Sequence, residues 1–360
     1  MYHLTAVRTR RRTAALTLAI VMSLASPRAA TRGPDAAGYT ASDATVFSFI
    51  DVAAAGGASI LADTDDATAV LTLPFAFPFY GEARTLLCVS SNGAVYFVGA
   101  VDDCAGIVDF ANTDLSTTVA PGDRAGLFPL WSDLTFDVPG AGAVFYQSVG
   151  APGSRKFIVQ WNNAFPSGSS APVTFQVVLM EETGQALFQY KTVDLGGENQ
   201  ASQGGAATVG VRNGNALVTG QYLQWSLGVP VLVNESAILF DKQRRMRGSG
   251  FNSPEAPAFR ATFTIDARGP VAPSGSFQYV YLRTRMTFAA TQVTNVSLSG
   301  ADMMVDGLGT VNGAAGYKFT ATAADGSPDR VGLVIRRVSD DSIFYSAPLL
   351  PLGGGSLALQ

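Results

Sequence analysis

The sequence contains little histidine, cysteine or charge. Its only histidine is His3, and charged residues make up 14% of the chain. Once the amino-terminal segment that carries His3 is removed, the chain cannot build a Ser-His-Asp triad, a Cys-His pair or a histidine-ligated zinc or copper site. Helix-period patterns with Glu and Lys on one face are also missing after residue 40. These absences exclude the histidine-dependent enzyme classes and disfavour a helical fold.

The first residues have the pattern of a secretory signal peptide. Four arginines within residues 8–12 precede an apolar run from Ala14 to Ala25, and small residues at its end allow cleavage after Ala25. A transmembrane helix is one alternative, but it needs about 20 apolar residues, and this run stops at Pro27. A twin-arginine export signal is another. We expect residues 1–25 to be a signal peptide and the protein to be secreted, extracellular or at the cell surface.

The chain that follows the signal is acidic. Without residues 1–25 it has 20 Lys and Arg against 28 Asp and Glu, a net charge of −8. Nucleic-acid affinity depends on neutralising phosphates with Lys and Arg, so we expect no nucleic-acid partner. No later segment is apolar for long enough to span a membrane. Residues 26–45, rich in Ala, Arg, Pro and Gly, are expected to form a disordered leader.

The rest of the chain has an all-β composition. It contains 38 Gly and 18 Pro, and alternating runs such as FIVQW (157–161) and VTFQVVLM (173–180) place apolar residues on one face. Many such strands joined by turns form a sandwich, because two sheets must cover each other's apolar faces. We expect an N-terminal antiparallel β-sandwich over residues 46–241 and a smaller antiparallel β domain over residues 258–360.

The segment between these domains, residues 242–257, collects charge, Gly, Ser and Pro. This composition is typical of a linker. The segment holds four basic residues, Lys242, Arg244, Arg245 and Arg247. They form either a solvated part of the linker or a contact for an anionic polymer.

The stretch LPFAFPFYG, residues 73–81, combines aromatic bulk with two prolines. Proline cannot donate a hydrogen bond to a neighbouring strand, which predicts an edge or bent strand. The three phenylalanines recur at every second position and therefore share one face. We interpret the stretch as a rim strand that drives three rings into the sandwich core.

The order of several motifs resembles a known extracellular module. LPFAFPFYG is followed by VSSNGAVYF, LFPLWSDL, KFIVQWNN and TFQVVLMEETGQALFQY. Over residues 45–241 this order is similar to nidogen-type and plexin-domain-containing extracellular regions, and above all to the related modules of bacterial secreted proteins. Residues 258–358 resemble a small β domain of bacterial secreted proteins called post-COAP. Neither resemblance supplies a catalytic residue.

The two cysteines, Cys88 and Cys104, are expected to form a disulfide, because an oxidising compartment favours pairing. The bridge would tie a loop to the hairpin around Asn92. The alternatives are two buried free thiols or one reactive thiol.

Two groups of aspartates are candidate calcium ligands, since clustered loop carboxylates suit a cation that takes six to eight oxygens. The first group consists of Asp63, Asp65 and Asp66. The second, weaker group consists of Asp102, Asp103 and Asp109. The alternative for both is an acidic, solvated turn. We expect no other cofactor.

The resemblance assigns residues 131–133 to a Trp-Asp loop, which makes Trp131 and Asp133 candidate ligand-binding residues. Trp131 and Trp161 would offer aromatic platforms to sugars if they were exposed, and the alternative is that both belong to the core. Glu181 and Glu182 form the best carboxylate pair for acid-base chemistry, but adjacent residues at a hairpin tip cannot flank a glycosidic bond.

These features predict a secreted, non-catalytic binding or adhesion protein that acts on an extracellular protein or matrix surface. A carbohydrate-binding protein, assisted by calcium, is the first alternative. A hydrolase that uses carboxylates alone is the second, and it would need two acids facing each other across a cleft.

Overall fold

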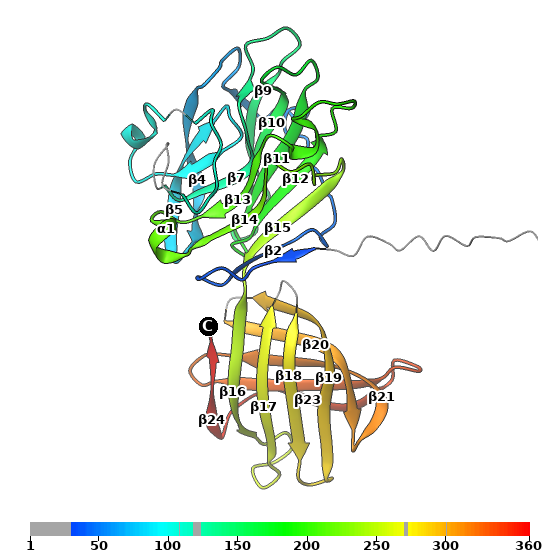
Figure 1. Ribbon diagram of the computed structural model, residues 1–360. Helices are drawn as coiled ribbons and strands as arrows, with labels where there is room; N and C mark the ends of the chain where they lie inside the picture. Colours follow the sequence, from blue (N-terminus) through cyan, green and yellow to red (C-terminus); the bar gives the residue numbers. More distant parts are fainter. Residues whose placement is uncertain (1–29, 108, 118–123, 270–272, 300) are drawn as a thin grey trace, which may run out of the picture.

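The computed structural model describes residues 30–360 apart from 108, 118–123, 270–272 and 300. Two β domains follow one another, one above the other in Figure 1. Their sheets are antiparallel throughout, so the predicted all-β class is confirmed. The predicted signal peptide, residues 1–25, lies outside the described residues.

The first domain is a sandwich of two sheets. The larger sheet contains β1 (Thr31–Arg32), β2 (Tyr39–Ser42), β3 (Ala58–Ile60), β8 (Leu134–Thr135), β9 (Ala143–Val149), β10 (Lys156–Pro166), β11 (Val173–Met180), β12 (Ala186–Thr192) and β15 (Ser236–Lys242). Its order is β1-β2-β15-β12-β11-β10-β9-β3, with β8 paired to β10. The smaller sheet contains β4 (Thr68–Phe79), β5 (Glu82–Ser90), β6 (Val95–Phe97), β7 (Gly126–Trp131), β13 (Thr208–Arg212) and β14 (Tyr222–Leu227), in the order β14-β13-β7-β6-β5-β4. Short helices are η1 (Val101–Cys104), η2 (Ser202–Gly204) and α1 (Ala216–Thr219).

The strand β4 has the predicted rim position. It lies at the edge of the smaller sheet. At an edge, the missing N–H of a proline can face away from the neighbouring strand, so no hydrogen bond between the strands is lost. Its pairing with β5 is irregular between Thr72 and Phe77, the segment that contains Pro74. Phe75, Phe77 and Phe79 are buried in the core between the two sheets. The aromatic stretch is therefore a structural element of the sandwich.

The second domain is one nine-stranded sheet that curls into a half-barrel. Its strands are β16 (Arg244–Asn252), β17 (Ala261–Gly269), β18 (Ser274–Tyr281), β19 (Met286–Ser299), β20 (Asp302–Val311), β21 (Ala314–Ala324), β22 (Arg330–Arg337), β23 (Ile343–Pro351) and β24 (Gly354–Leu359). The order is β23-β22-β21-β20-β19-β18-β17-β16-β24. Apolar side chains from the inner face form its core. The amide Nδ2 of Asn252 reaches the carbonyl of Val331 at 3.0 Å, which joins β16 to β22 across the curl.

The predicted leader is wrong over the part that the structure describes. Within residues 26–45, β2 pairs with β15 and β1 pairs with β2. Tyr39 is 5% exposed and stacks on Tyr80 with ring centroids 4.3 Å apart. The open edge of β15 accepts a strand through its backbone groups, which carry no compositional signature. These residues therefore belong to the sandwich.

The predicted linker, residues 242–257, is also wrong over most of its length. Residues 244–252 form β16, which pairs with β17 along its whole length and with β24 from Met246 to Phe251. A single residue, Gln243, separates it from β15. Met246 points into the core, while Arg245 and Arg247 point outward. The charges are the outward half of an alternating strand, which composition alone does not distinguish from a solvated linker.

Candidate functional site

The hairpin between β5 and β6 places a buried amide at the end of the sandwich away from the half-barrel. Asn92 is 0% exposed. Its Nδ2 donates to carboxylate oxygens of Asp66 at 2.9 Å and Asp109 at 3.1 Å. Its Oδ1 accepts from the backbone N–H of Leu134 at 2.8 Å. Asn92 therefore ties two acidic residues to the start of β8.

Asp109 is a structural carboxylate. It is buried, and it accepts hydrogen bonds from the hydroxyls of Ser90 at 2.7 Å and Tyr96 at 2.8 Å. Its backbone carbonyl accepts from Nε1 of Trp131. Burial raises the pKa of Asp109, while the hydrogen bonds from Ser90, Tyr96 and Asn92 act against that rise. All these contacts are internal, so Asp109 does not present ligand oxygens to solvent.

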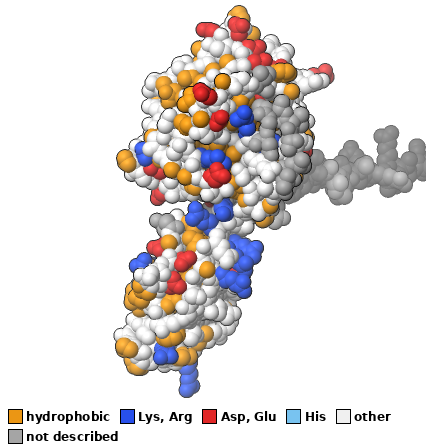
Figure 2. Space-filling model, turned by 90° about the vertical axis from the view of Figure 1, so that its left-hand side faces the viewer, with side chains coloured by type: hydrophobic (Ala, Val, Ile, Leu, Met, Phe, Trp, Pro, Cys, Tyr) orange, Lys and Arg blue, Asp and Glu red, His pale blue; other side chains and the backbone are white. Residues whose placement is uncertain are grey.

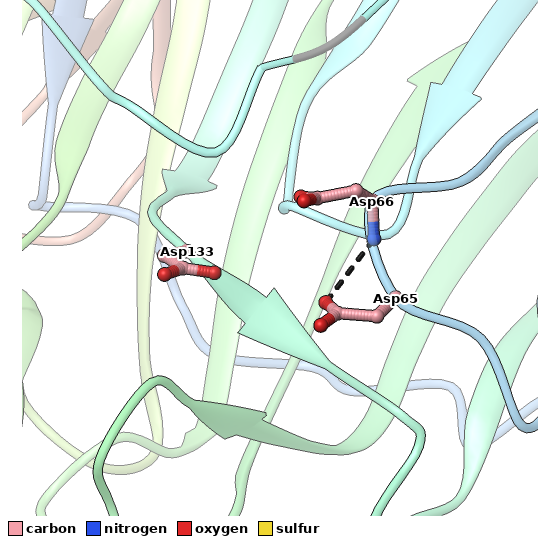
Figure 3. A group of neighbouring side chains, drawn as sticks. All are labelled: Asp65, Asp66 and Asp133. Atoms are coloured by element: carbon pink, nitrogen blue, oxygen red, sulfur yellow. Dashed lines mark hydrogen bonds between the residues drawn. The ribbon is translucent and has the colours of Figure 1, made fainter.

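Beside this network, three carboxylates from two loops face one another. We call Asp65, Asp66 and Asp133 the acidic group; their nearest oxygens lie within 4.8 Å of one another. Figure 3 shows Asp65 and Asp66 on the loop before β4 and Asp133 opposite them, after β7. Burial, followed by the neighbouring charge of Asp66, raises the pKa of Asp65. Oxygen ligands of this kind suit a hard cation, and calcium binding there stays a prediction.

The structure rearranges the predicted calcium groups. Asp63 is not part of the acidic group, whereas Asp133 joins it from a distant part of the sequence. In the second predicted group, Asp103 accepts from the backbone N–H of Ala100 at 2.9 Å and holds the start of η1. Asp109 is buried apart from Asp102 and Asp103, which are exposed. That group is not assembled among the described residues.

The predicted disulfide is present. Cys88 in β5 and Cys104 in η1 are bonded, with their Cα atoms 5.3 Å apart. Both are buried. The bridge fixes η1 against the smaller sheet, next to the segment that carries Asp109.

The tryptophans are core residues. Trp131 and Trp161 are 1% and 0% exposed. Trp161 stacks on Phe175 with centroids 5.0 Å apart, and its Nε1 donates to the carbonyl of Ser90 at 2.9 Å. The chain's third tryptophan, Trp225, is also buried. None of them is an aromatic platform for sugars, so the prediction of Trp131 as a ligand-binding residue is wrong.

The two glutamates of the β11–β12 hairpin have different surroundings. Glu181 accepts two side-chain hydrogen bonds from Arg155, at 2.7 and 2.6 Å. This contact lowers the pKa of Glu181 to about 2. Glu181 is therefore the ionised partner of an ion pair. Glu182 is exposed and lines a cavity at the domain junction.

Two cavities of about 300 and 290 Å³ flank the single residue that joins the domains. Both are lined by Thr183, Asp241 and Arg244. Asp241 is 5% exposed and accepts from Nε2 of Gln185 at 2.8 Å. Burial raises the pKa of Asp241 to about 6. Sequence reasoning missed this site; its signal was Asp241, which directly follows the apolar run AILF of a strand.

The replacement Asp241→Asn is expected to make the protein progressively more stable than the parent as the pH rises from about 4 to about 6. The unfolded carboxyl ionises near its ordinary pKa of 3.8, whereas the folded one holds its proton to about pH 6. Ionisation therefore costs the folded parent roughly 2–3 kcal/mol by pH 7. The asparagine oxygen still accepts from Gln185.

Urea unfolding midpoints of both proteins at pH 4, 5, 6 and 7 measure the effect. Asp137→Asn, at an exposed position, controls for a general loss of one negative charge. A stability difference that does not change with pH would contradict the assignment.

At the end of the sandwich away from the domain junction, the loop between β14 and β15 exposes three valines. We call Val229, Val231 and Val233 the valine row; they are 47%, 43% and 60% exposed. Leu232 between them is buried. The backbone N–H groups of residues 231 and 232 both donate to the carbonyl of Gln203 at 3.0 Å. Pro230 borders a cavity of about 510 Å³ formed by residues 194–203.

The described residues form an all-β sandwich followed by an all-β half-barrel. The family model described as NIDO related matches residues 38–238. The chain therefore belongs to the nidogen-related family, and the predicted resemblance of the first domain is confirmed. Nidogen-related domains are typically extracellular. The post-COAP resemblance of the second domain stays a prediction.

Neither the curated proteins nor the solved structures contained a match.

Among the residues that the structure describes, no helix is both long enough and apolar enough to cross a bilayer.

Proposed function

We propose that this protein is a secreted, non-catalytic binding protein, and that its sandwich contacts a protein of the cell surface or matrix through the valine row. The observation that carries the proposal is the exposure of three apolar side chains at alternate positions of one ordered loop. Exposed apolar patches with polar surroundings are typical of protein interaction sites.

The loop is held in place before any partner arrives. The side-chain oxygen of Asn234 accepts from the backbone N–H groups of Val193 and Asp194, at 2.7 and 2.9 Å. Together with the hydrogen bonds to Gln203, these contacts fix the loop from both sides. A fixed loop loses little conformational entropy on binding, which supports a recognition role.

Two further observations support a protein partner and a non-catalytic role. All three tryptophans are buried, so a sugar would find no exposed indole on which to stack. Glu181 is engaged by Arg155, and that contact keeps it ionised, which disfavours a role as a general acid. Carbohydrate binding is therefore the alternative that the test must separate.

Binding of the purified protein to immobilised collagen, fibronectin and laminin, in parallel with a glycan array, tests the proposal. We expect saturable binding to at least one of the proteins. The triple replacement of Val229, Val231 and Val233 by Ser should weaken it about tenfold or more, because buried apolar contacts at an interface centre dominate affinity.

The matched control replaces three exposed valines elsewhere, Val46, Val101 and Val338, which are 80%, 59% and 53% exposed. It should bind as the parent does. Selective binding to glycans without binding to any of the proteins, or equal losses in the two triple variants, would overturn the proposal.

A further inference from the structure

The two domains carry charge of opposite sign. Residues 30–243 contain 8 Lys and Arg against 20 Asp and Glu, whereas residues 244–360 contain 11 against 8. The net charge of −4 for the whole chain conceals this division. Figure 2 shows Lys and Arg side chains gathered at the junction and along one side of the lower domain.

The outer face of β16 and β17 concentrates this positive charge. Arg245 and Arg268 lie directly opposite each other in the pairing of the two strands, and Arg247 lies opposite Asp266. Arg245 makes two hydrogen bonds to Asp266, one of them at 2.6 Å. Arg247 and Arg268 are exposed. One carboxylate thus faces three guanidinium groups, and two positive charges are left for an external anion.

The side chains around these arginines are short and hydroxylated. In the pairing of β17 with β18, Arg268 lies opposite Ser274 and Asp266 lies opposite Ser276. Asp266, Arg268 and residues 274–276 line a hollow of about 230 Å³. Further along the same face, Ser249 pairs with Thr264. The face therefore presents guanidinium and hydroxyl groups on a sheet surface that is open to a long ligand.

We propose that this face binds an acidic polysaccharide, with Arg247 and Arg268 holding its carboxylate or sulfate groups. The planar guanidinium fork matches both anions, and the neighbouring hydroxyls can exchange hydrogen bonds with sugar hydroxyls. Arg245, held by Asp266, contributes its charge from a fixed position. Successive outward residues of a strand are about 7 Å apart and adjacent strands about 5 Å apart, so one polymer chain can reach both exposed arginines.

The surroundings favour a polysaccharide over a nucleic acid. Proteins that bind single strands stack bases on exposed aromatic rings. The outward positions of β16 and β17 hold one aromatic residue, Phe251, and the guanidinium of Arg260 covers its ring at 4.4 Å from the centroid. The strongly acidic sandwich also opposes the long tracks of phosphate contacts that duplex binding requires.

The test measures binding of the whole protein to polygalacturonate, which carries carboxylates, to dextran sulfate, to neutral dextran and to single-stranded DNA. We expect binding to one or both acidic polysaccharides, no binding to dextran, and a loss of about tenfold or more between 50 and 300 mM salt, since the contact is ionic. The double variant Arg247→Gln/Arg268→Gln should bind about tenfold or more weakly. Which acidic polymer binds decides between carboxylate and sulfate recognition.

The control variant Arg285→Gln/Arg330→Gln removes the same charge from exposed positions elsewhere in the half-barrel and should bind within about twofold of the parent. An equal loss in both variants would overturn the assignment to this face, because it would show that only the overall charge matters. Tighter binding to DNA than to either polysaccharide, or equal binding to dextran, would overturn the partner class. The valine row lies on the other domain, so the two proposals can fail independently.

Discussion

Gly93→Ala is expected to destabilise the sandwich by about 2–5 kcal/mol. Gly93 has a φ of +72°, a conformation that costs an alanine about 1–2 kcal/mol. A Cβ at this position would also lie 2.0 Å from the carbonyl oxygen of Leu130. That oxygen belongs to the backbone of β7 and cannot rotate away, so the strand must move. Displacing well-packed groups costs roughly another 1–3 kcal/mol.

Urea unfolding followed by tryptophan fluorescence measures this effect in the sandwich alone, because the chain's three tryptophans are Trp131, Trp161 and Trp225. Gly168→Ala is the matched control. Gly168 has a φ of +74°, and a Cβ there would meet nothing within 4 Å. The Gly168→Ala variant should lose only the stability that the left-handed backbone conformation costs an alanine, about 1–2 kcal/mol. Equal losses for the two variants would show that the contact with Leu130 relaxes at no cost.

Asn92→Ala is expected to destabilise the sandwich by a comparable amount, about 3–5 kcal/mol. The replacement removes both hydrogen bonds that the Asn92 amide donates, and it leaves the buried carboxylate of Asp109 with fewer donors. It also removes the acceptor of the Leu134 backbone N–H. Buried groups left without partners cost about 1–3 kcal/mol each, and more when they are charged. The same fluorescence measurement reports the loss.

Asn295→Ala tests whether the effect belongs to the buried network. Asn295 also donates to a carboxylate, at 3.0 Å to Asp306, but both side chains are at the surface. Water replaces that hydrogen bond, so the variant should stay within about 0.5 kcal/mol of the parent. Because Asn295 lies in the half-barrel, which has no tryptophan, circular dichroism follows the unfolding of both asparagine variants. A similarly small loss for Asn92→Ala would mean that water or a shift of β8 satisfies the exposed partners.

The two proposals assign different tasks to the two domains. The valine row lies where β15 begins. The outer face of β16 and β17 with Arg245, Arg247 and Arg268, here called the arginine face, lies beyond the junction, where β15 ends. Under the two proposals together, the half-barrel would attach the molecule to an acidic matrix, and the sandwich would present its apolar loop to a protein. The face contains Arg245 and Arg247, two of the four basic residues that composition alone assigned to a linker.

The features that the sequence predicted correctly depend on local patterns. Alternation at every second residue specified the strands, because a half-buried strand requires it whatever its neighbours are. The prolines of LPFAFPFYG specified an edge strand, because proline removes a donor from any ladder. The disulfide followed from the presence of only two cysteines. The family relation followed from the order of motifs along the chain.

The features that the sequence did not determine depend on residues that are far apart along the chain. Asp133 joins Asp65 and Asp66 because β8 begins beside the loop that precedes β4. Arg268 joins Arg245 because β16 and β17 are paired in that register. The strands β1 and β2 form because β15 has an open edge. Such contacts arise from backbone pairing, which is the same for every residue type, so only the tertiary structure decided which side chains meet.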